Sequence, residues 1–172
     1  MELPLETPRL TLRPLSLDDI PALQRIGGQQ RVARMLLSVK SPWAAEDVRA
    51  WIERARWRGR PGFRLAICLK GGSPLIGSVG MGGTPATCAY FLDPDHWGKG
   101  YATEAMQAFL AACFASFGID AIEADHFADN PASGRVLQKL GFVEIGRGEG
   151  RSAARAGPSP NVLYRLTRPE TP

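Results

Sequence analysis

A short glycine-rich segment in the second half of the chain has the composition of a phosphate site. Gly98 and Gly100 flank Lys99, and an apolar-periodic stretch follows directly. Glycine lets a phosphate approach the backbone because no Cβ stands in the way. The first turn of a helix adds unpaired N–H groups and the positive end of the helix dipole. The pattern therefore predicts an anion site at the start of a helix that runs from Ala102 to Phe117.

Two common phosphate motifs fit this segment poorly. In a P-loop the lysine is followed by a serine or threonine that holds magnesium, whereas Gly100 follows Lys99 here. A dinucleotide fingerprint would need a third glycine where Thr103 stands, and its acidic residue would close the next strand, whereas Asp120 precedes that strand. The sequence thus disfavours a nucleotide triphosphatase and gives little weight to a dinucleotide-binding enzyme.

Three segments, in order along the chain, carry a family resemblance. Trp97, Gly100 and Ala102 occupy the places of a motif that reads Arg or Gln, two residues, Gly, one residue, then Gly or Ala. Residues 7–13 look like an opening strand, and residues 130–142 look like a second cofactor motif. On these grounds nearly the whole chain resembles the GNAT superfamily of acyl-CoA N-acyltransferases. Trp97 departs from Arg or Gln, but the run WGKGYATEA is similar to the branch of ribosomal-protein N-terminal (RimJ/RimL-like) acetyltransferases.

The resemblance implies an N-acetyltransferase that uses acetyl-CoA and no metal. The amine attacks the thioester carbonyl, an oxyanion forms, and the thiolate of coenzyme A leaves without a covalent enzyme intermediate. A backbone N–H near Phe91 or Leu92, where the family separates two strands, would hold the oxyanion. The implied cofactor site comprises Phe91, Leu92, Trp97, Gly98, Lys99, Gly100, Tyr101, Ala102, Thr103, Asn130 and Ser133.

The acceptor stays open between a small molecule and a protein N-terminus, and the acyl group between acetyl and a longer chain. An α-amine with a pKa near 8 is about a tenth neutral at pH 7, whereas a lysine near 10.4 is neutral about once in 2,000 molecules. A site without an obvious strong base therefore favours α-amines. The non-enzymatic alternative is a cofactor-binding sensor or interaction domain, which turnover would distinguish.

Candidate catalytic residues surround the second motif. Asn130 is expected to cap the helix that begins at Pro131, and the resemblance also places its side chain on the pantetheine arm. The resemblance places Ser133 near the cofactor sulfur, where it or a water would protonate the thiolate, although serine is unremarkable at this helical position. Many relatives carry a tyrosine acid seven residues after the asparagine, a role that Leu137 excludes. Some place a general base five residues before it, which makes Asp125 the candidate, with a solvated sheet-face carboxylate as the alternative.

The elements that must position these residues follow from hydrophobic periodicity. Strands are predicted at residues 9–14, 63–69, 75–81, 87–92, 119–127, 142–145 and 162–166, and helices at 16–26, 45–55, 102–117 and 131–140. This order predicts an α+β, or mixed α/β, fold. It agrees with the GNAT-like fold that the resemblance implies, a central, mostly antiparallel twisted sheet of about seven strands flanked by about four helices.

Length, charge and cysteine spacing limit the classes of protein to which the chain can belong. The length of 172 residues fits one domain, 1–172. No secretory signal is evident and the longest apolar stretch is too short to span a bilayer, which predicts a cytoplasmic protein without a membrane partner. The net charge of +4 forms no basic stripe, so direct nucleic-acid binding is not expected. A monomer or a homodimer is expected. Cys68, Cys88 and Cys113 are expected to be buried free thiols because their spacing matches no metal site.

The predicted connection between the last two strands, Gly146 to Pro160, is rich in glycine, serine and arginine. Such a loop is expected to be mobile. We also expect it to belong to the acceptor site, because the resemblance places these strands beside the separated pair. Its Arg147, Arg151 and Arg155 would meet an acidic acceptor, with solvated surface arginines as the alternative.

Overall fold

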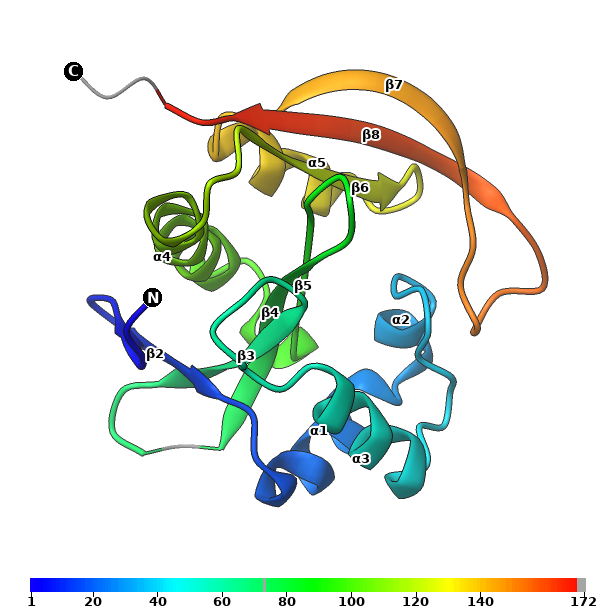
Figure 1. The fold of residues 1–172 in the computed structure, drawn as a ribbon. Helices are drawn as coiled ribbons and strands as arrows, with labels where there is room; N and C mark the ends of the chain where they lie inside the picture. Colours follow the sequence, from blue (N-terminus) through cyan, green and yellow to red (C-terminus); the bar gives the residue numbers. More distant parts are fainter. Residues whose placement is uncertain (73, 170–172) are drawn as a thin grey trace.

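The structure is a computed structural model that describes residues 1–72 and 74–169. In this part of the chain an eight-stranded sheet has the order β1-β2-β3-β4-β5-β6-β8-β7 (Figure 1). Neighbouring strands are antiparallel except for the parallel pair β5 and β6. The strands are β1 (Leu5–Glu6), β2 (Leu10–Pro14), β3 (Phe63–Leu69), β4 (Leu75–Gly82), β5 (Thr87–Leu92), β6 (Ala121–Phe127), β7 (Val143–Gly150) and β8 (Ser159–Thr167).

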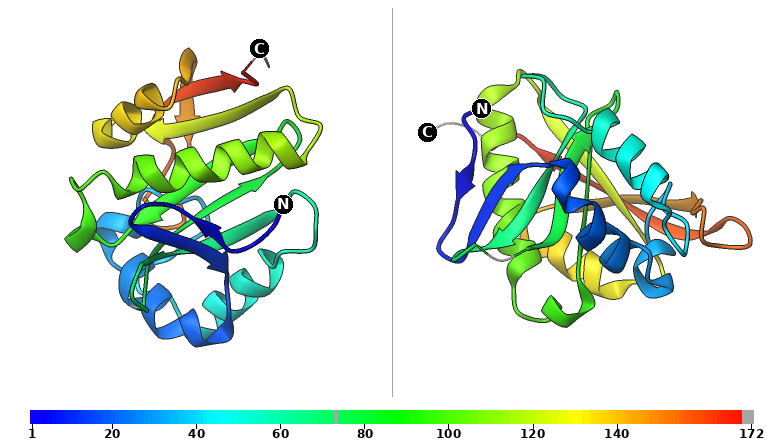
Figure 2. Two further views of the ribbon diagram at one scale, coloured as in Figure 1. Left: turned by 90° about the vertical axis from the view of Figure 1, so that its left-hand side faces the viewer. Right: turned by 90° about the horizontal axis from the view of Figure 1, so that it is seen from below.

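Helices cover both faces of the sheet (Figure 2). They are α1 (Ile20–Gly27), α2 (Gln30–Ala33), α3 (Ala45–Arg54), α4 (Tyr101–Ser116) and α5 (Pro131–Lys139), with short 3-10 helices η1 (Leu17–Asp19) and η2 (Pro94–His96). The first three α-helices pack with Ala66, Cys68 and Phe91 on one face. The last two pack on the other face, around Phe109 and Leu137. Among the described residues no helix has both the length and the apolarity that a membrane crossing needs.

The long helix α4 carries the apolar stripe that its sequence predicts. Met106, Phe109 and Cys113 are each 0% exposed and pack against the sheet. All three cysteines are free and buried, as expected. Burial raises the pKa of the Cys88 thiol to about 12 and that of Cys113 to about 12, so both remain protonated and unreactive at neutral pH.

The sheet opens between β5 and β6. A single pair, Thr87 with Glu123, joins these fully described strands, whereas seven pairs join β6 to β8. Beyond that pair, β5 runs on to Leu92 and β6 to Phe127 without pairing to each other. The glycine-rich segment follows the end of β5, and the turn into α5 follows the end of β6. The gap therefore lies between the two predicted cofactor motifs.

The predicted fold class, mixed α/β with a mostly antiparallel sheet, is confirmed. The structure adds the two-residue strand β1 and the four-residue helix α2, both too short to show a period in the sequence. The predicted loop from Gly146 to Pro160 is wrong in its bounds. Residues 146–150 and 159–160 extend the two strands, because β7 pairs with β8 as far as Gly150 and Ser159 despite the glycines.

Candidate active site

The glycine turn before α4 has the backbone that a phosphate site requires. Gly98 has φ 74° and Gly100 has φ 79°, both in the left-handed region that favours glycine. Gly100 is also the N-cap of α4. A Cβ built on Gly98 would meet no heavy atom within 4 Å, so the space above the turn is open. These residues fit the pyrophosphate of a nucleotide cofactor.

A polar clamp from the start of the chain holds this turn. Glu104, in the first turn of α4, accepts hydrogen bonds from Thr7 Oγ1 at 2.6 Å and from Arg9 Nε at 2.6 Å. The Nη1 of Arg9 donates to the Lys99 carbonyl at 3.0 Å, and its guanidinium lies 4.5 Å from the centroid of the Tyr101 ring. Burial alone would raise the pKa of Glu104, but hydrogen bonds from Thr7 and Arg9 lower it below its ordinary value. These contacts join residues more than 90 positions apart, so no local sequence pattern predicts them.

The other residues of the predicted cofactor turn have different surroundings. Trp97 is 50% exposed, and its indole Nε1 donates to the Leu92 carbonyl at 2.9 Å. Lys99 Nζ donates to the Asp95 carbonyl at 2.9 Å. Tyr101, Ala102 and Thr103 form the partly exposed first turn of α4. Contacts of Trp97 and Lys99 with the preceding residues Leu92 and Asp95 therefore hold the turn in place.

Phe91 and Leu92 are both buried, so they can offer a ligand only their backbone. The N–H of Asp93 donates to the Ile76 carbonyl on β4 at 2.7 Å. Because N–H groups alternate between the two edges of a strand, the N–H of Leu92 points toward the gap and that of Phe91 toward β4. Of the two predicted oxyanion donors, Leu92 is the one that the strand directs into the gap.

An ion pair between a buried carboxylate and a half-exposed arginine fixes the end of β5. The side chain of Asp93 is 3% exposed, and its Oδ2 lies 2.6 Å from Nη1 of Arg25 on α1. Burial alone would raise the pKa of Asp93, but the hydrogen bond from Arg25 and one from the Asp95 N–H lower it below its ordinary value. The pair joins α1 to the strand that enters the glycine turn.

Replacing Asp93 with asparagine is expected to lower the free energy of unfolding by about 1–2 kcal/mol at pH 7, because the buried carboxylate loses its charge-assisted hydrogen bond to the half-exposed Arg25. A depressed folded pKa adds stability above the unfolded pKa, and this contribution disappears as the pH falls through the folded value. The difference from wild type should therefore shrink below about pH 4. Urea unfolding at pH 7 and pH 3 measures it, with the exposed Asp95→Asn as control. An equal difference at both pH values would refute the assignment.

A hydroxyl pair joins β5 to the first turn of α5. Ser133 Oγ, in the first turn of α5, is 2.9 Å from the hydroxyl of Tyr90 on β5. Burial raises the pKa of Tyr90 to about 12, although its hydrogen bond with Ser133 opposes the rise, so Tyr90 stays protonated at neutral pH. Asn130 caps α5 as predicted, and its Oδ1 accepts from the Ser133 N–H at 3.4 Å. Leu137 is 1% exposed and belongs to the core.

The structure places Asp125 on the opposite sheet face from the His126 side chain. His126 is buried beneath α5, where a Cβ on Gly134 would lie 2.6 Å from its Nε2. Asp125 is exposed and accepts a hydrogen bond from Asn161 Nδ2 at 2.8 Å. Glu123, on the same face as Asp125, forms an ion pair with Arg165 at 3.4 Å. Asp125 therefore remains accessible on the face that α1, α2 and α3 partly cover.

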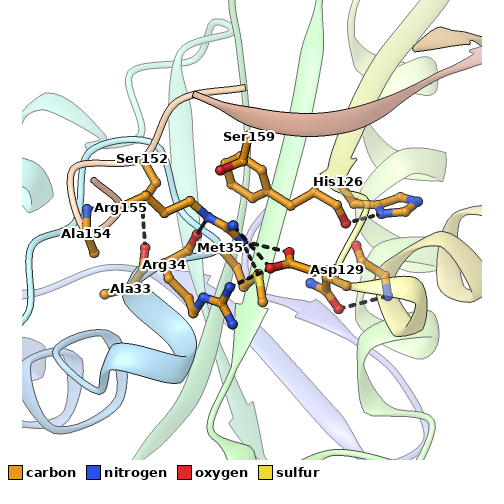
Figure 3. A network of polar contacts seen from close by, with 12 residues as sticks. Ala33, Arg34, Met35, His126, Asp129, Ser152, Ala154, Arg155 and Ser159 are labelled. Atoms are coloured by element: carbon orange, nitrogen blue, oxygen red, sulfur yellow. Dashed lines mark hydrogen bonds and ion pairs between the residues drawn. The ribbon is translucent and has the colours of Figure 1, made fainter. Parts of the chain in front are cut away.

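A network of ion pairs and hydrogen bonds links the β7–β8 connection to the start of α5 (Figure 3). Arg155 makes two hydrogen bonds to Asp129, at 2.8 and 3.1 Å, and donates through Nε to the Arg34 carbonyl at 2.8 Å. Arg34 forms a second ion pair with Asp129. The Arg155 guanidinium also lies 4.0 Å from the centroid of the Phe127 ring. The hydrogen bond from Arg155 holds the pKa of Asp129 below its ordinary value.

This network corrects the prediction that three loop arginines form one acceptor surface. Arg155 is 11% exposed and committed to Asp129, Arg147 pairs with Glu144 on its own strand, and Arg151 is exposed. The connection is also anchored, since Ser152 Oγ donates to the carbonyl of residue 33 on α2 (Figure 3). Long-range pairing of this kind cannot be read from the composition of a loop.

The structure thus combines an open glycine turn with a sheet that separates between its two parallel strands. Residues 9–143 match the family model described as an acetyltransferase (GNAT) domain. The chain belongs to the GNAT acetyltransferase family, and it is an N-acetyltransferase. This confirms the prediction from the sequence.

Named relatives agree with this assignment. The uncharacterized N-acetyltransferase YoaA of Bacillus subtilis (strain 168) is 30% identical over 149 residues, covering 83% of this chain and 84% of that protein. A GNAT-family acetyltransferase from Bacillus anthracis superposes with a TM-score of 0.82 at 20% identity, covering 96% of this chain and 98% of that one. RimL, a ribosomal L7/L12 alpha-N-protein acetyltransferase in complex with coenzyme A, superposes with a TM-score of 0.78 at 16% identity, covering 96% and 98%. Because both structures are at most 20% identical to this chain, they show that the fold is shared and no more.

Proposed function

We propose that this N-acetyltransferase moves an acetyl group from acetyl-CoA directly to a primary amine at the gap between β5 and β6. The arrangement around the gap carries the proposal. The open glycine turn of Gly98 and Gly100 lies at the end of β5, and the Ser133–Tyr90 hydroxyl pair joins β5 to α5. The coenzyme A complex of RimL supports the cofactor.

Each residue around the gap has a chemical task in this proposal. Bound acetyl-CoA supplies an activated thioester carbonyl. The Leu92 N–H is a preorganised donor for negative charge on the reacting oxygen. Ser133 offers a hydroxyl proton to the departing sulfur, and Asp125 can accept a proton from the amine on the opposite face.

An α-amine is the acceptor that this site fits best. The proton acceptor in this proposal is a carboxylate, Asp125, which is exposed and accepts a hydrogen bond from Asn161, and carboxylates as a class are weak bases. A weak base suffices for an α-amine, about a tenth of which is neutral at pH 7, and not for a lysine side chain. RimL is a ribosomal L7/L12 alpha-N-protein acetyltransferase, which is consistent with this choice. Release of coenzyme A thiol from acetyl-CoA in the presence of amines tests the proposal, because a non-catalytic sensor would bind the cofactor without turnover.

Replacing Tyr90 with phenylalanine is expected to lower kcat about three- to tenfold, the worth of one hydrogen bond. A protonated Tyr90 that donates to Ser133 Oγ leaves the serine proton free to point elsewhere, and the variant loses this orientation. The KM for acetyl-CoA should change little, because the ring stays in place. Tyr164→Phe is the matched control, since its buried hydroxyl faces His126 at 3.5 Å. Equal effects of the two variants on kcat would contradict the role of Tyr90.

A further inference from the structure

One row of residues crosses the sheet face that α1 and α3 partly cover. The strand registers place Arg64 opposite Gly80, and Gly80 opposite Ala89. The parallel pair that joins β5 to β6 lies two residues before Ala89 and two before Asp125. Residues that face each other in paired strands share a sheet face. The row therefore has a cation at one end, a carboxylate at the other, and two very small residues between them, beside the gap.

The arginine of this row lies flat across β4. A Cβ built on Gly80 would be 2.2 Å from the Cγ of Arg64, so the side chain occupies the space that the glycine leaves. Its guanidinium lies 5.1 Å from the centroid of the Trp51 ring on α3. Adjacent strands are about 4.8 Å apart, so a side chain that crosses β4 from β3 extends toward β5 and the gap.

Arg64 is partly buried as a residue, and its guanidinium lacks the partner that a buried charge normally has. Among residues 1–72 and 74–169, Arg64 makes no ion pair and no side-chain hydrogen bond, and its Nη1 is a buried atom without a partner. By contrast, the partly buried Arg13 and Arg155 are bonded to Asp19 and Asp129. Burial lowers the pKa of Arg64 to about 10, which still leaves it charged at pH 7. A buried charge costs free energy unless it is paired.

We propose that Arg64 binds a carboxylate of the amine acceptor, so that the acceptor is an amino acid or a short acidic segment whose carboxylate lies a few bonds from its amine. The proposal rests on the proposed acetyl transfer at the gap. The fork of an arginine matches a carboxylate through two parallel hydrogen bonds. The acceptor amine would then lie over Ala89, next to Asp125, and the small, partly exposed side chain of Ala89 leaves room for the acceptor between the Arg64 side chain, which covers Gly80, and the carboxylate.

The first test needs no substrate turnover. Arg64→Met keeps the unbranched side chain over Trp51 and removes the charge. If Arg64 has no partner within the protein, the Tm of Arg64→Met should equal or exceed that of wild type. The substitution removes an unpaired charge, whose burial lowers the free energy of unfolding. L-serine should raise the Tm of wild type and not that of Arg64→Met, and L-serinamide should raise neither. A Tm several degrees lower in Arg64→Met, or equal stabilisation by serine in both proteins, would overturn the proposal.

The second test compares acceptors that differ in one carboxylate. The pairs are L-serine with L-serinamide, and the C-terminally amidated dipeptides Ser-Glu and Ser-Gln. In wild type, kcat/KM should be about tenfold or more higher for the carboxylate member of at least one pair. Arg64→Met should abolish this preference, Arg64→Lys should retain part of it, and the exposed Arg58→Met should retain all of it. A preference that persists in Arg64→Met, or no preference in wild type, would overturn the role of Arg64.

The two tests separate failure of this inference from failure of the proposed function. If wild type binds acetyl-CoA and releases thiol with none of the amines, the proposed function fails, and the Tm comparison still decides whether Arg64 holds a carboxylate. If acetyl-CoA releases thiol at equal rates with both members of each acceptor pair, acetyl transfer stands and the role of Arg64 is refuted.

Discussion

Replacing Ser133 with alanine is expected to lower kcat about a hundredfold, which is the usual contribution of a positioned proton donor. The KM for acetyl-CoA should change by much less, because the lost interaction forms as charge develops on the leaving sulfur. The helix should keep its start, since Asn130 caps α5 through the backbone N–H of residue 133 and alanine retains that group. Steady-state thiol release, with the exposed Ser116→Ala on α4 as control, measures the effect.

The double variant Tyr90→Phe, Ser133→Ala decides whether the two hydroxyls act as a unit. If Tyr90 acts by orienting Ser133, its removal should have almost no further effect once the serine is gone. Independent, additive losses would show that Tyr90 acts elsewhere in the site. A normal kcat in Ser133→Ala would leave this serine as a packing residue of α5 and would refute the proton-donor assignment.

Replacing Gly100 with valine is expected to weaken the binding of coenzyme A by about thirtyfold or more, which corresponds to about 2 kcal/mol. The left-handed φ of 79° is unfavourable for a β-branched residue, so the turn must change its shape or bear the strain. A Cβ would clash with nothing, since its nearest neighbour is Arg9 Nη2 at 3.4 Å. The loss therefore arises from the altered turn and from the side chain beside the phosphate. Isothermal calorimetry with coenzyme A measures it.

Gly59→Val supplies the control for backbone strain. Gly59 has φ 74° in a surface turn, and a Cβ there would also meet no heavy atom within 4 Å. The two variants should lose similar amounts of stability, whereas only Gly100→Val should lose affinity for coenzyme A. Unchanged affinity in a folded Gly100→Val protein would show that the pyrophosphate binds elsewhere.

The parts of the site that the sequence predicted are those that depend on local pattern. The two glycines predict a turn, and the apolar periodicity predicts α4. An asparagine before a proline predicts the start of α5. Each of these features depends on residues within one or two turns of each other. The structure confirms them as the turn at Gly100 and the cap at Asn130.

The parts that the sequence missed depend on strand register and on contacts between distant segments. Tyr90 meets Ser133 across 43 positions, and Thr7 meets Glu104 across 97. Arg64 and Asp125 share a row only because three strand pairings bring them into line. No period or motif encodes such registers. The same limit explains why Arg155 was predicted to face an acceptor when it is bonded to Asp129.

Thiol release from acetyl-CoA in the presence of amines tests the central claim most directly. Purified protein, acetyl-CoA and α-amine acceptors, with and without a carboxylate, should release thiol at a rate that is saturable in both substrates. The rate should fall about a hundredfold in Ser133→Ala. Calorimetric binding of acetyl-CoA without release of thiol above the rate of hydrolysis, for every amine in the series, would contradict the proposed acetyl transfer at this site.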